Sequence, residues 1–410
     1  MARDRKLNQL IFILALIFMG VRINLIGSIS LTEIYVLLQT PILIKWVVNS
    51  SLPYLKTLCV LFLALILAQA LSEYMVQNSF VNAVRGIAIT IMALLLFLFF
   101  LKILLRDISL IKWIPIGLLI QLILWGDQFG YAKTGEDSYF KFYVAPMVTY
   151  TVCYLSMSRI NLLRKNILWI FLFASLFIII GGARSSGFCL LFCALFYIIY
   201  RRYKSIKIKR ILPALLLIAI LFQLFYAHVY VPKVASGEWG TAQNRMQLAR
   251  VDNSTNVLMM LLSARAGVYV SYLAFLDKPL WGHGAWVKDK DFKYARIQAE
   301  LFPSEKVRID KKNIPLVPTH TVIIGMGTRN GIWAFAVFGI ILIIVYKIGI
   351  KAIATESLYS VYSIYLIISS FIQLLFGPPA TLKNSVAIIF SVFFALYYYK
   401  KINNSRVHEI

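Results

Sequence analysis

Residues 82–105 read NAVRGIAITIMALLLFLFFLKILL, and this apolar run decides the class of fold. As a helix the run is long enough to cross a hydrocarbon core of roughly 30 Å. Inside a bilayer every backbone amide and carbonyl must bond within its own segment, so the run is expected to be helical. The chain of 410 residues is 60% hydrophobic and 14% charged, with a mean hydropathy of +0.78. This composition is that of a membrane protein rather than a soluble domain.

Similar apolar runs recur along the chain, and they predict an all-α polytopic membrane protein with about twelve transmembrane helices. The basic N-terminus enters the first run without a small-residue cleavage site, so no cleavable signal peptide is predicted. The predicted spans are residues 9–26, 31–49, 55–72, 82–105, 111–126, 142–157, 166–181, 186–200, 211–230, 331–349, 358–376 and 382–399.

One long polar segment, Pro232–Pro318, interrupts this pattern and divides the chain into three parts. Residues 1–231 are expected to hold transmembrane helices 1–9, and residues 319–410 a re-entry segment and helices 10–12. Within the segment between them, residues 256–275 have the apolar spacing of a helix, whereas residues 288–312 are highly charged and predict a solvated helix or lid.

The distribution of Lys and Arg predicts the topology. Connections of one set are strongly basic, and the alternate set, Gly27–Ser30, Glu73–Asn78 and Asp127–Lys141, is poor in positive charge or mixed. Basic connections favour the cytoplasm, so both termini are predicted inside and Pro232–Pro318 outside. The same bias explains the net charge of +25 without a nucleic-acid partner. The basic set is Arg3/Arg5/Lys6, Lys102/Arg106/Lys112, Arg159/Arg164/Lys165, Arg201–Arg210, Lys347/Lys351 and Lys400/Lys401/Arg406.

Soluble catalytic signatures are missing from the sequence. It has no P-loop, dinucleotide fingerprint, HExxH motif or Cys/His cluster with metal spacing, so no metal or cofactor is predicted. Asp289-Lys290-Asp291 approaches a metal motif, but its lysines favour a solvated charge run. The four cysteines all fall in apolar runs, which is typical of buried thiols that pack as small hydrophobic groups.

Four arginines at the outer ends of predicted spans are candidate binding residues: Arg22, Arg85, Arg184 and Arg265. A charge at the edge of a span is costly, so it is usually paired or functional. Arg184 stands out because its neighbours in Gly-Gly-Ala-Arg-Ser-Ser-Gly (181–187) are small and a guanidinium fits phosphate oxygens. Snorkelling to lipid headgroups is the alternative for Arg22, Arg85 and Arg184, and an ordinary ion pair is the alternative for Arg265.

Two of the four histidines are candidate site residues. His283 lies between Gly282 and Gly284, where the glycines can matter more than the imidazole. His320 follows Pro318 where the polar segment re-enters the membrane, so a neutral imidazole there could accept a proton near a lipid-borne substrate.

The order of these motifs resembles the O-antigen ligase/Wzy polymerase superfamily of bacterial lipid-linked glycan polymerases and ligases. The resemblance covers roughly residues 165–350. It rests on Gly-Ala-Arg-Ser-Ser-Gly at 182–187, Ser-Ala-Arg at 263–265, Lys-Pro-Leu-Trp-Gly-His-Gly at 278–284, and His320 with Gly331 eleven residues later. One departure is Thr321, where many ligases have Asn after the histidine.

The resemblance implies a metal-independent, inverting membrane glycosyltransferase whose donor is an undecaprenyl-diphosphate-linked oligosaccharide. Arg184 and Arg265 would bind the diphosphate, Arg265 and His320 would be catalytic, and Arg22, Arg85 and His283 are possible additional site residues. Fixed guanidinium groups can stabilise the charge that develops on a leaving diphosphate.

The predicted activity is polymerisation of O-antigen or another surface polysaccharide, in the bacterial inner membrane with the active site on the periplasmic side. Besides the bilayer, a chain-length regulator or other polysaccharide-assembly proteins are candidate partners. Two alternatives are a ligase that transfers the glycan to lipid A core and a flippase or exporter of the lipid-linked glycan. A transporter would be expected to show inverted halves with polar mid-membrane residues, whereas here the charges gather at one face.

Overall fold

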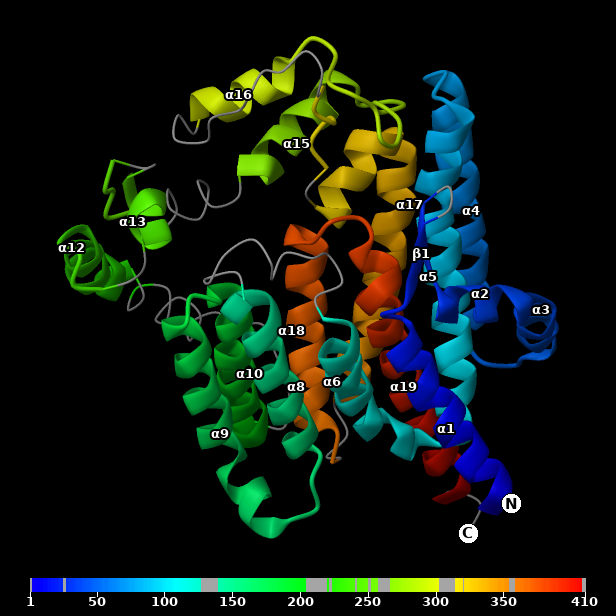
Figure 1. Cartoon of the computed structure of the whole chain (residues 1–410). Coiled ribbons are helices and arrows are strands. Elements are labelled where there is room, and N and C mark those ends of the chain that lie inside the picture. Colours follow the sequence, from blue (N-terminus) through cyan, green and yellow to red (C-terminus); the bar gives the residue numbers. More distant parts are fainter. Residues whose placement is uncertain are drawn as a thin grey trace.

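The computed structural model describes residues 2–24, 27–126, 139–203, 220, 223–239, 242–249, 252–256, 266–301, 314–319, 321–353 and 358–407. Within these ranges the chain is almost entirely helical, and the only sheet among them has two short strands. Figure 1 shows long helices that run side by side in one body.

The elements follow one another along the chain as helices interrupted by one short hairpin. The first half contains α1 (Ala2–Phe18), β1 (Arg22–Asn24), β2 (Ser28–Ser30), α2 (Leu31–Leu38), α3 (Thr40–Asn49), α4 (Leu55–Met75), α5 (Phe80–Arg106), η1 (Ile108–Lys112), α6 (Trp113–Trp125), η3 (Phe140–Val144), α8 (Ala145–Ser156), α9 (Asn161–Ile180) and α10 (Arg184–Tyr203). The second half contains η4 (Tyr226–Tyr230), α12 (Val231–Ala235), α13 (Ala242–Ala249), α15 (Ala266–Asp277), α16 (Lys293–Leu301), α17 (Val322–Ile353), α18 (Ser360–Phe376), η5 (Leu382–Val386) and α19 (Ala387–Val407).

Six helical stretches of the described chain are long and apolar enough to cross a membrane: Leu55–Met75, Phe80–Arg106, Ile108–Trp125, Arg184–Arg202, Val322–Ile353 and Leu382–Tyr399. The pair α2 and α3, bent by 56° at its break, would make a seventh. Shorter apolar helices are Lys6–Phe18, Lys165–Ile180, Gly267–Asp277 and Ser360–Phe376. The class of helical membrane protein therefore agrees with the composition, while the count of about twelve spans stays a prediction. Most of the predicted span 211–230 lies outside the described residues.

The predicted span 9–26 is wrong in its second half. Helix α1 ends at Phe18, and β1 pairs antiparallel with β2, so Arg22 lies opposite Ser30. The chain leaves the helix where Gly20 packs on α6: a Cβ at Gly20 would lie 2.5 Å from Cδ1 of Trp125. The backbone groups of β1 then bond to β2 instead of to a helical turn, which qualifies the all-α prediction.

The predicted span 31–49 is a broken helix, and the predicted span 331–349 is the second part of a helix that begins earlier. Between α2 and α3, Pro41 lies in the first turn of α3 and has no N–H with which to continue the earlier helix. Helix α17 begins at Val322, earlier than the predicted start at residue 331, and Gly331 interrupts it with φ 72° and ψ −172°. That left-handed backbone is readily adopted only by glycine. The break in α17 becomes the base of the candidate site.

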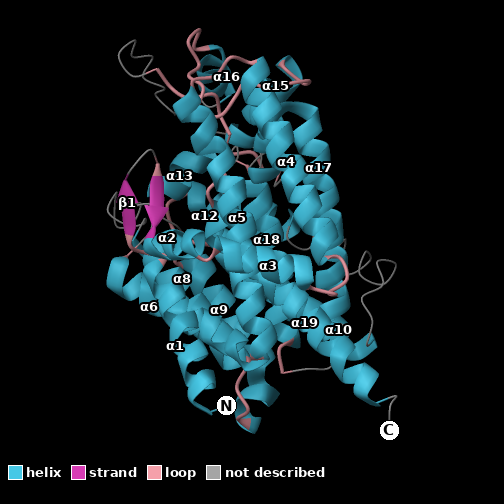
Figure 2. Cartoon of the chain, turned by 90° about the vertical axis from the view of Figure 1, so that its right-hand side faces the viewer, coloured by secondary structure: helices cyan, strands magenta, loops and turns pink. Residues whose placement is uncertain are grey.

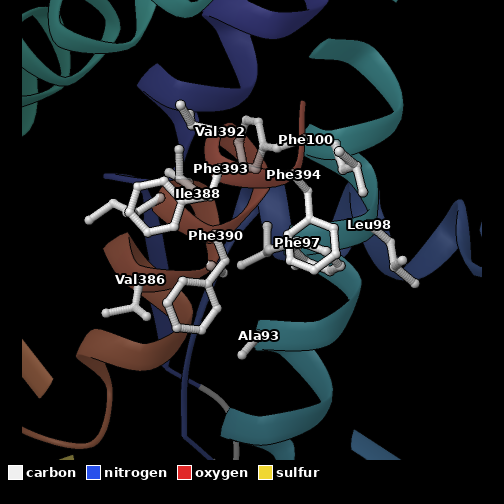
Figure 3. Close-up of a cluster of buried hydrophobic side chains, with 14 of the residues drawn as sticks. Ala93, Phe97, Leu98, Phe100, Val386, Ile388, Phe390, Val392, Phe393 and Phe394 are labelled. Carbon is white, nitrogen blue, oxygen red and sulfur yellow. The ribbon is translucent and has the colours of Figure 1, made fainter. Parts of the chain in front are cut away.

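The largest hydrophobic cluster among the described residues includes the contact between α5 and α19. Figure 3 shows Phe97 and Phe394 facing each other across this contact, with ring centroids 5.2 Å apart and planes at 80°. Phe100 and Phe393 are fully buried in the same cluster. Between lipid-embedded helices such van der Waals packing, rather than water exclusion, holds the spans together. The apolar run 82–105 thus forms the central span of the fold.

The two ends of the bundle differ. In Figures 1 and 2 the beginning of α1 and the end of α19 lie at one end, while α15 and α16 lie beyond the other. We call the latter the loop end. Helix α15 lies within and just beyond the helical segment predicted at 256–275, and α16 lies inside the charged segment 288–312. The start of α1 and the end of α19 thus lie opposite α15 and α16, while the side of the membrane on which each end lies stays a prediction.

Candidate functional site

The motif Pro279–Gly284 docks over the break in α17. The amides of His283 and Gly284 donate to the carbonyls of Thr328 and Arg329, both at 2.8 Å, and the amide of Ile332 donates to the carbonyl of Pro279 at 2.7 Å. The docked backbones leave no room for side chains. A Cβ at Gly331 would lie 2.1 Å from the carbonyl oxygen of Leu280, and one at Gly282 would lie 2.5 Å from the carbonyl of Arg329. The two glycines are therefore required by contact, as well as by their positive φ.

Glu73, in the last turn of α4, ties this docked segment to the spans. Its side chain is buried, and it accepts hydrogen bonds from the Ala285 amide at 2.9 Å, from Asn330 Nδ2 at 3.1 Å and from Asn78 Nδ2 at 2.6 Å. Three charge-assisted bonds compensate for the removal of a carboxylate from water. Sequence reasoning missed Glu73, although an acid at the end of an apolar run is a signal that could have found it.

The side chain of His283 links α15 to α16. Its Nε2 lies 2.8 Å from the carbonyl oxygen of Ala274 and 3.1 Å from the hydroxyl of Tyr294. A carbonyl can only accept, so Nε2 carries the proton. The Tyr294 hydroxyl donates to Asp277 Oδ2 at 2.7 Å, and Lys293 pairs with the same oxygen at 2.5 Å. These contacts give His283 a structural role at the loop end.

The buried imidazole of His283 predicts that the stability of the protein depends on pH. Burial is the largest cause that lowers the pKa of His283 from 6.5. As the pH falls below 6.5 the unfolded chain binds this proton before the folded chain does, so the free energy of unfolding decreases. Between pH 7.5 and 5.5 we expect the melting temperature of the purified wild type to fall more than that of His283→Gln, whose amide can still donate to Ala274. Equal slopes in the two proteins would contradict this role.

Asp289 caps α16. Its carboxylate accepts from the amides of Lys293 at 3.1 Å, Tyr294 at 2.9 Å and Ala295 at 3.0 Å, and the residue is buried. From the sequence Asp289 is expected to be solvated as part of a charge run, and this is wrong, because its carboxylate accepts from the first amides of a helix.

In the described part of the chain no three His, Cys, Asp or Glu residues gather as metal ligands would. The four cysteines are free thiols, three of them buried.

Arg184 begins α10 at the loop end of the α9–α10 pair. The turn before it needs its glycines: Gly182 has φ 93°, and a Cβ at Gly181 would lie 2.0 Å from the ring of Phe140. The half-buried guanidinium donates from Nη2 to Asn244 Oδ1 at 2.6 Å and to the hydroxyl of Tyr230, and its Cζ lies 5.1 Å from the centre of the Tyr230 ring. Asn244 of the polar segment and Tyr230 at the end of η4 thus hold a fixed cation at this end.

Arg265 and His320 lie outside the described residues, whereas Ala266, Thr319 and Thr321 beside them are described. Helix α15 begins at Ala266, and its Ser271 hydroxyl donates to the carbonyl of Pro318 at 2.6 Å. The hydroxyl of Thr321 donates to the carbonyl of Leu374 at the end of α18 at 3.3 Å, and it accepts the Ile324 amide at 3.2 Å. Thr321, which departs from the ligase pattern, therefore caps α17.

Arg22 and Arg85 belong to another part of the loop end. Arg22 is in β1, and Arg85 lies beside the hairpin turn, where a Cβ at Gly27 would be 3.7 Å from Arg85 Cγ. The hairpin is held by a buried ion pair: Lys383 Nζ lies 2.6 Å from Glu33 Oε1 and donates to the carbonyl of Ser28 at 3.0 Å. The structure thus brings the two arginines to one hairpin, and none of the contacts described for Arg184 involves them.

Comparison with known proteins adds no relative: no family model matches the chain, and no curated protein matches it. The class established by the fold is a helical membrane protein with a docked polar segment at one end.

Proposed function

We propose that the protein is a membrane glycosyltransferase that transfers an undecaprenyl-diphosphate-linked glycan to an acceptor sugar hydroxyl, as a polymerase of O-antigen or another surface polysaccharide. The proposal places it in the O-antigen ligase/Wzy polymerase superfamily, with about twelve spans in the bacterial inner membrane and its active site on the periplasmic side. It takes the loop end as the periplasmic end.

The observation that carries the proposal is the setting of Arg184. Its guanidinium is half-buried where a lipid headgroup would meet the polar segment, and Tyr230 and Asn244 hold it in place. A glycosyl diphosphate already contains a good leaving group, so the protein has to stabilise the negative charge that develops on it. A preorganised guanidinium in a site of low dielectric does so without reorganising during the reaction.

Arg265 and His320 complete the proposed mechanism. Arg265 would bind the second phosphate, and His320 would orient the acceptor hydroxyl and take its proton as the hydroxyl attacks the anomeric carbon opposite the diphosphate. The bond from Ser271 to Pro318 supports this, because it ties the helix after Arg265 to the chain just before His320. Attack from the opposite side inverts the anomeric centre.

The docking of Pro279–Gly284 supports an enzyme rather than the alternative of a flippase. Three backbone hydrogen bonds to α17 and the bond from Ala285 to Glu73 hold this segment in place, and the proposal takes it as a roof over the donor. A roof that excludes water also protects the activated donor from hydrolysis. The ligase alternative uses the same donor chemistry, so the acceptor has to be tested directly.

Arg184→Lys tests the proposal in the purified protein with undecaprenyl-diphosphate-linked repeat units. Lysine keeps the charge but cannot present the planar fork, so glycan transfer should fall about 10²–10³-fold. Arg201→Lys, an exposed position at the other end of α10, is the matched control and should keep wild-type transfer. Products lengthened by repeat units indicate a polymerase, and transfer only to lipid A core indicates a ligase. No transfer by the wild type to either acceptor would refute the proposed function.

A further inference from the structure

We propose that Arg329 forms a second oxyanion-binding site, beneath the docked segment, that takes a phosphate oxygen of the lipid-linked diphosphate. The identity of this ligand rests on the proposed function. The existence of the site rests on the burial and the bonding of Arg329.

Arg329 is a buried cation whose own protein contacts use little of its bonding capacity. The residue is 5% exposed. Among the described residues its guanidinium makes one hydrogen bond, from Nε to the carbonyl of Gly325 at 3.1 Å, and no ion pair. A guanidinium has five N–H donors, and removing a charge from water without partners is costly. Within the described part of the chain no acceptor is recorded for the two terminal amino groups, so they can meet an acceptor from a ligand.

Glu73 does not serve as that acceptor. Among the described residues it is the one acid that interacts with Arg329 through charge, but its carboxylate already accepts from the Ala285 amide, Asn330 and Asn78. No ion pair joins Glu73 to Arg329. Glu73 therefore moderates the cost of burying the cation and leaves its terminal donors to a ligand.

The hydrogen bond from Nε places the Arg329 side chain beside the first turns of α17. The bond from Nε to Gly325 folds the side chain back along α17 toward the start of the helix. Gly325 in turn lies against Thr319, where an added Cβ would be 3.5 Å from the threonine Cβ and carbonyl oxygen. Thr321 caps the same end of the helix. The first turns of a helix add a favourable field for an anion.

Burial gives the site its strength, because Arg329 is withdrawn from water. The carbonyls of Thr328 and Arg329 accept the amides of His283 and Gly284, so the docked segment covers the backbone at this point. An ionic hydrogen bond is stronger in such a covered site than in water. A planar guanidinium fork matches two oxygens of a phosphate, so a phosphate oxyanion is the ligand class that fits.

Binding measurements on the full-length protein in nanodiscs test this site. The probes are undecaprenyl diphosphate in the bilayer and inorganic pyrophosphate in solution, and the variants are Arg329→Gln and Arg329→Lys. Loss of one charged hydrogen-bonding group should raise the Kd of Arg329→Gln for both probes about 10- to 100-fold. Arg329→Lys should raise it at least about threefold, because the charge stays and the fork is lost. The matched control is Arg296→Gln, an exposed arginine in α16, which should bind within about twofold of the wild type.

A stability measurement separates a binding role from a purely structural one. A buried cation with one internal hydrogen bond adds little to the fold, so Arg329→Gln without ligand should melt at the wild-type temperature or above. The wild type should gain stability on adding pyrophosphate, and Arg329→Gln should not. If Arg329→Gln fails to fold, the binding role is refuted, because the arginine is then structural.

The outcomes for this site and for the proposed function are distinct. Undecaprenyl diphosphate binding that depends on Arg184 and is unchanged in both Arg329 variants would overturn the second site and leave the glycosyltransferase proposal standing. Pyrophosphate binding that depends on Arg329, with no binding of the lipid diphosphate, would support the site and count against the proposed donor. A wild type that binds neither probe would overturn both.

Discussion

His320→Ala is expected to lower glycan transfer about 10²–10⁴-fold, the usual contribution of a general acid or base. The acceptor hydroxyl is a weak nucleophile, and an imidazole hydrogen-bonded to it raises its reactivity as the diphosphate leaves. His320→Gln should lose a similar amount, because an amide can orient the hydroxyl but cannot take its proton. The measurement is single-turnover transfer with lipid-linked repeat units, together with the Kd for undecaprenyl diphosphate.

Donor binding provides the internal control for this prediction. Both His320 variants should bind undecaprenyl diphosphate as the wild type does, because the diphosphate is assigned to arginines. Robust transfer by His320→Gln would show that the residue orients the acceptor and does not act as a base. A loss of donor binding in both variants would place His320 with the diphosphate instead.

Lys383→Met is expected to lower the free energy of unfolding by about 3–5 kcal/mol, the range for breaking a buried ion pair. The side chains of Lys383 and Glu33 are 10% and 3% exposed, and the substitution would leave the Glu33 carboxylate buried beside neutral groups. Denaturant unfolding in detergent measures the effect. The double variant Lys383→Met with Glu33→Gln should recover a large part of the loss, because it removes the unpaired charge.

An exposed ion pair supplies the control. Lys293 and Asp277 also lie in contact, but their side chains are 54% and 36% exposed. Pairs in water contribute about 0–1 kcal/mol, so Lys293→Met should cost far less than Lys383→Met. Equal losses at the two sites would contradict the assignment of the Glu33–Lys383 pair as the anchor of the hairpin.

The sequence pointed to segments at the loop end of the molecule, but it could not give the contacts of individual side chains there. It singled out Pro279–Gly284 and Gly331 together, and the structure joins them through the close contact of Gly331 with Leu280. It also proposed His283 as a possible additional site residue; the imidazole contacts Ala274 and Tyr294, and a role in the site stays a prediction. The positive φ of these glycines is a local property of the backbone, whereas the contact between Gly331 and Leu280 joins distant segments. The role of the imidazole depended on α15 and α16 folding against each other.

Glu73, Arg329 and Lys383 show why other residues could not be found. Each is a charged residue in or at the end of an apolar run, and the sequence pattern alone cannot tell snorkelling from burial. Glu73 is satisfied by an amide more than two hundred residues later, and Lys383 by a carboxylate some three hundred and fifty residues earlier. Such partners are decided by which helix ends meet in space.

By itself the sequence determined that the chain is a helical membrane protein with one polar segment, because the bilayer demands long apolar helices whose backbone bonds are all local. The tertiary structure alone decided where α1 stops, where α17 breaks and which charges are buried. These features depend on contacts between distant segments: Gly20 against Trp125, Gly331 against Leu280, and Glu73 with Ala285. The hydrophobic pattern of the sequence describes each segment separately, so it carries no information about such contacts. A buried charge, for example, is tolerated only where another part of the chain, or a ligand, supplies its partner.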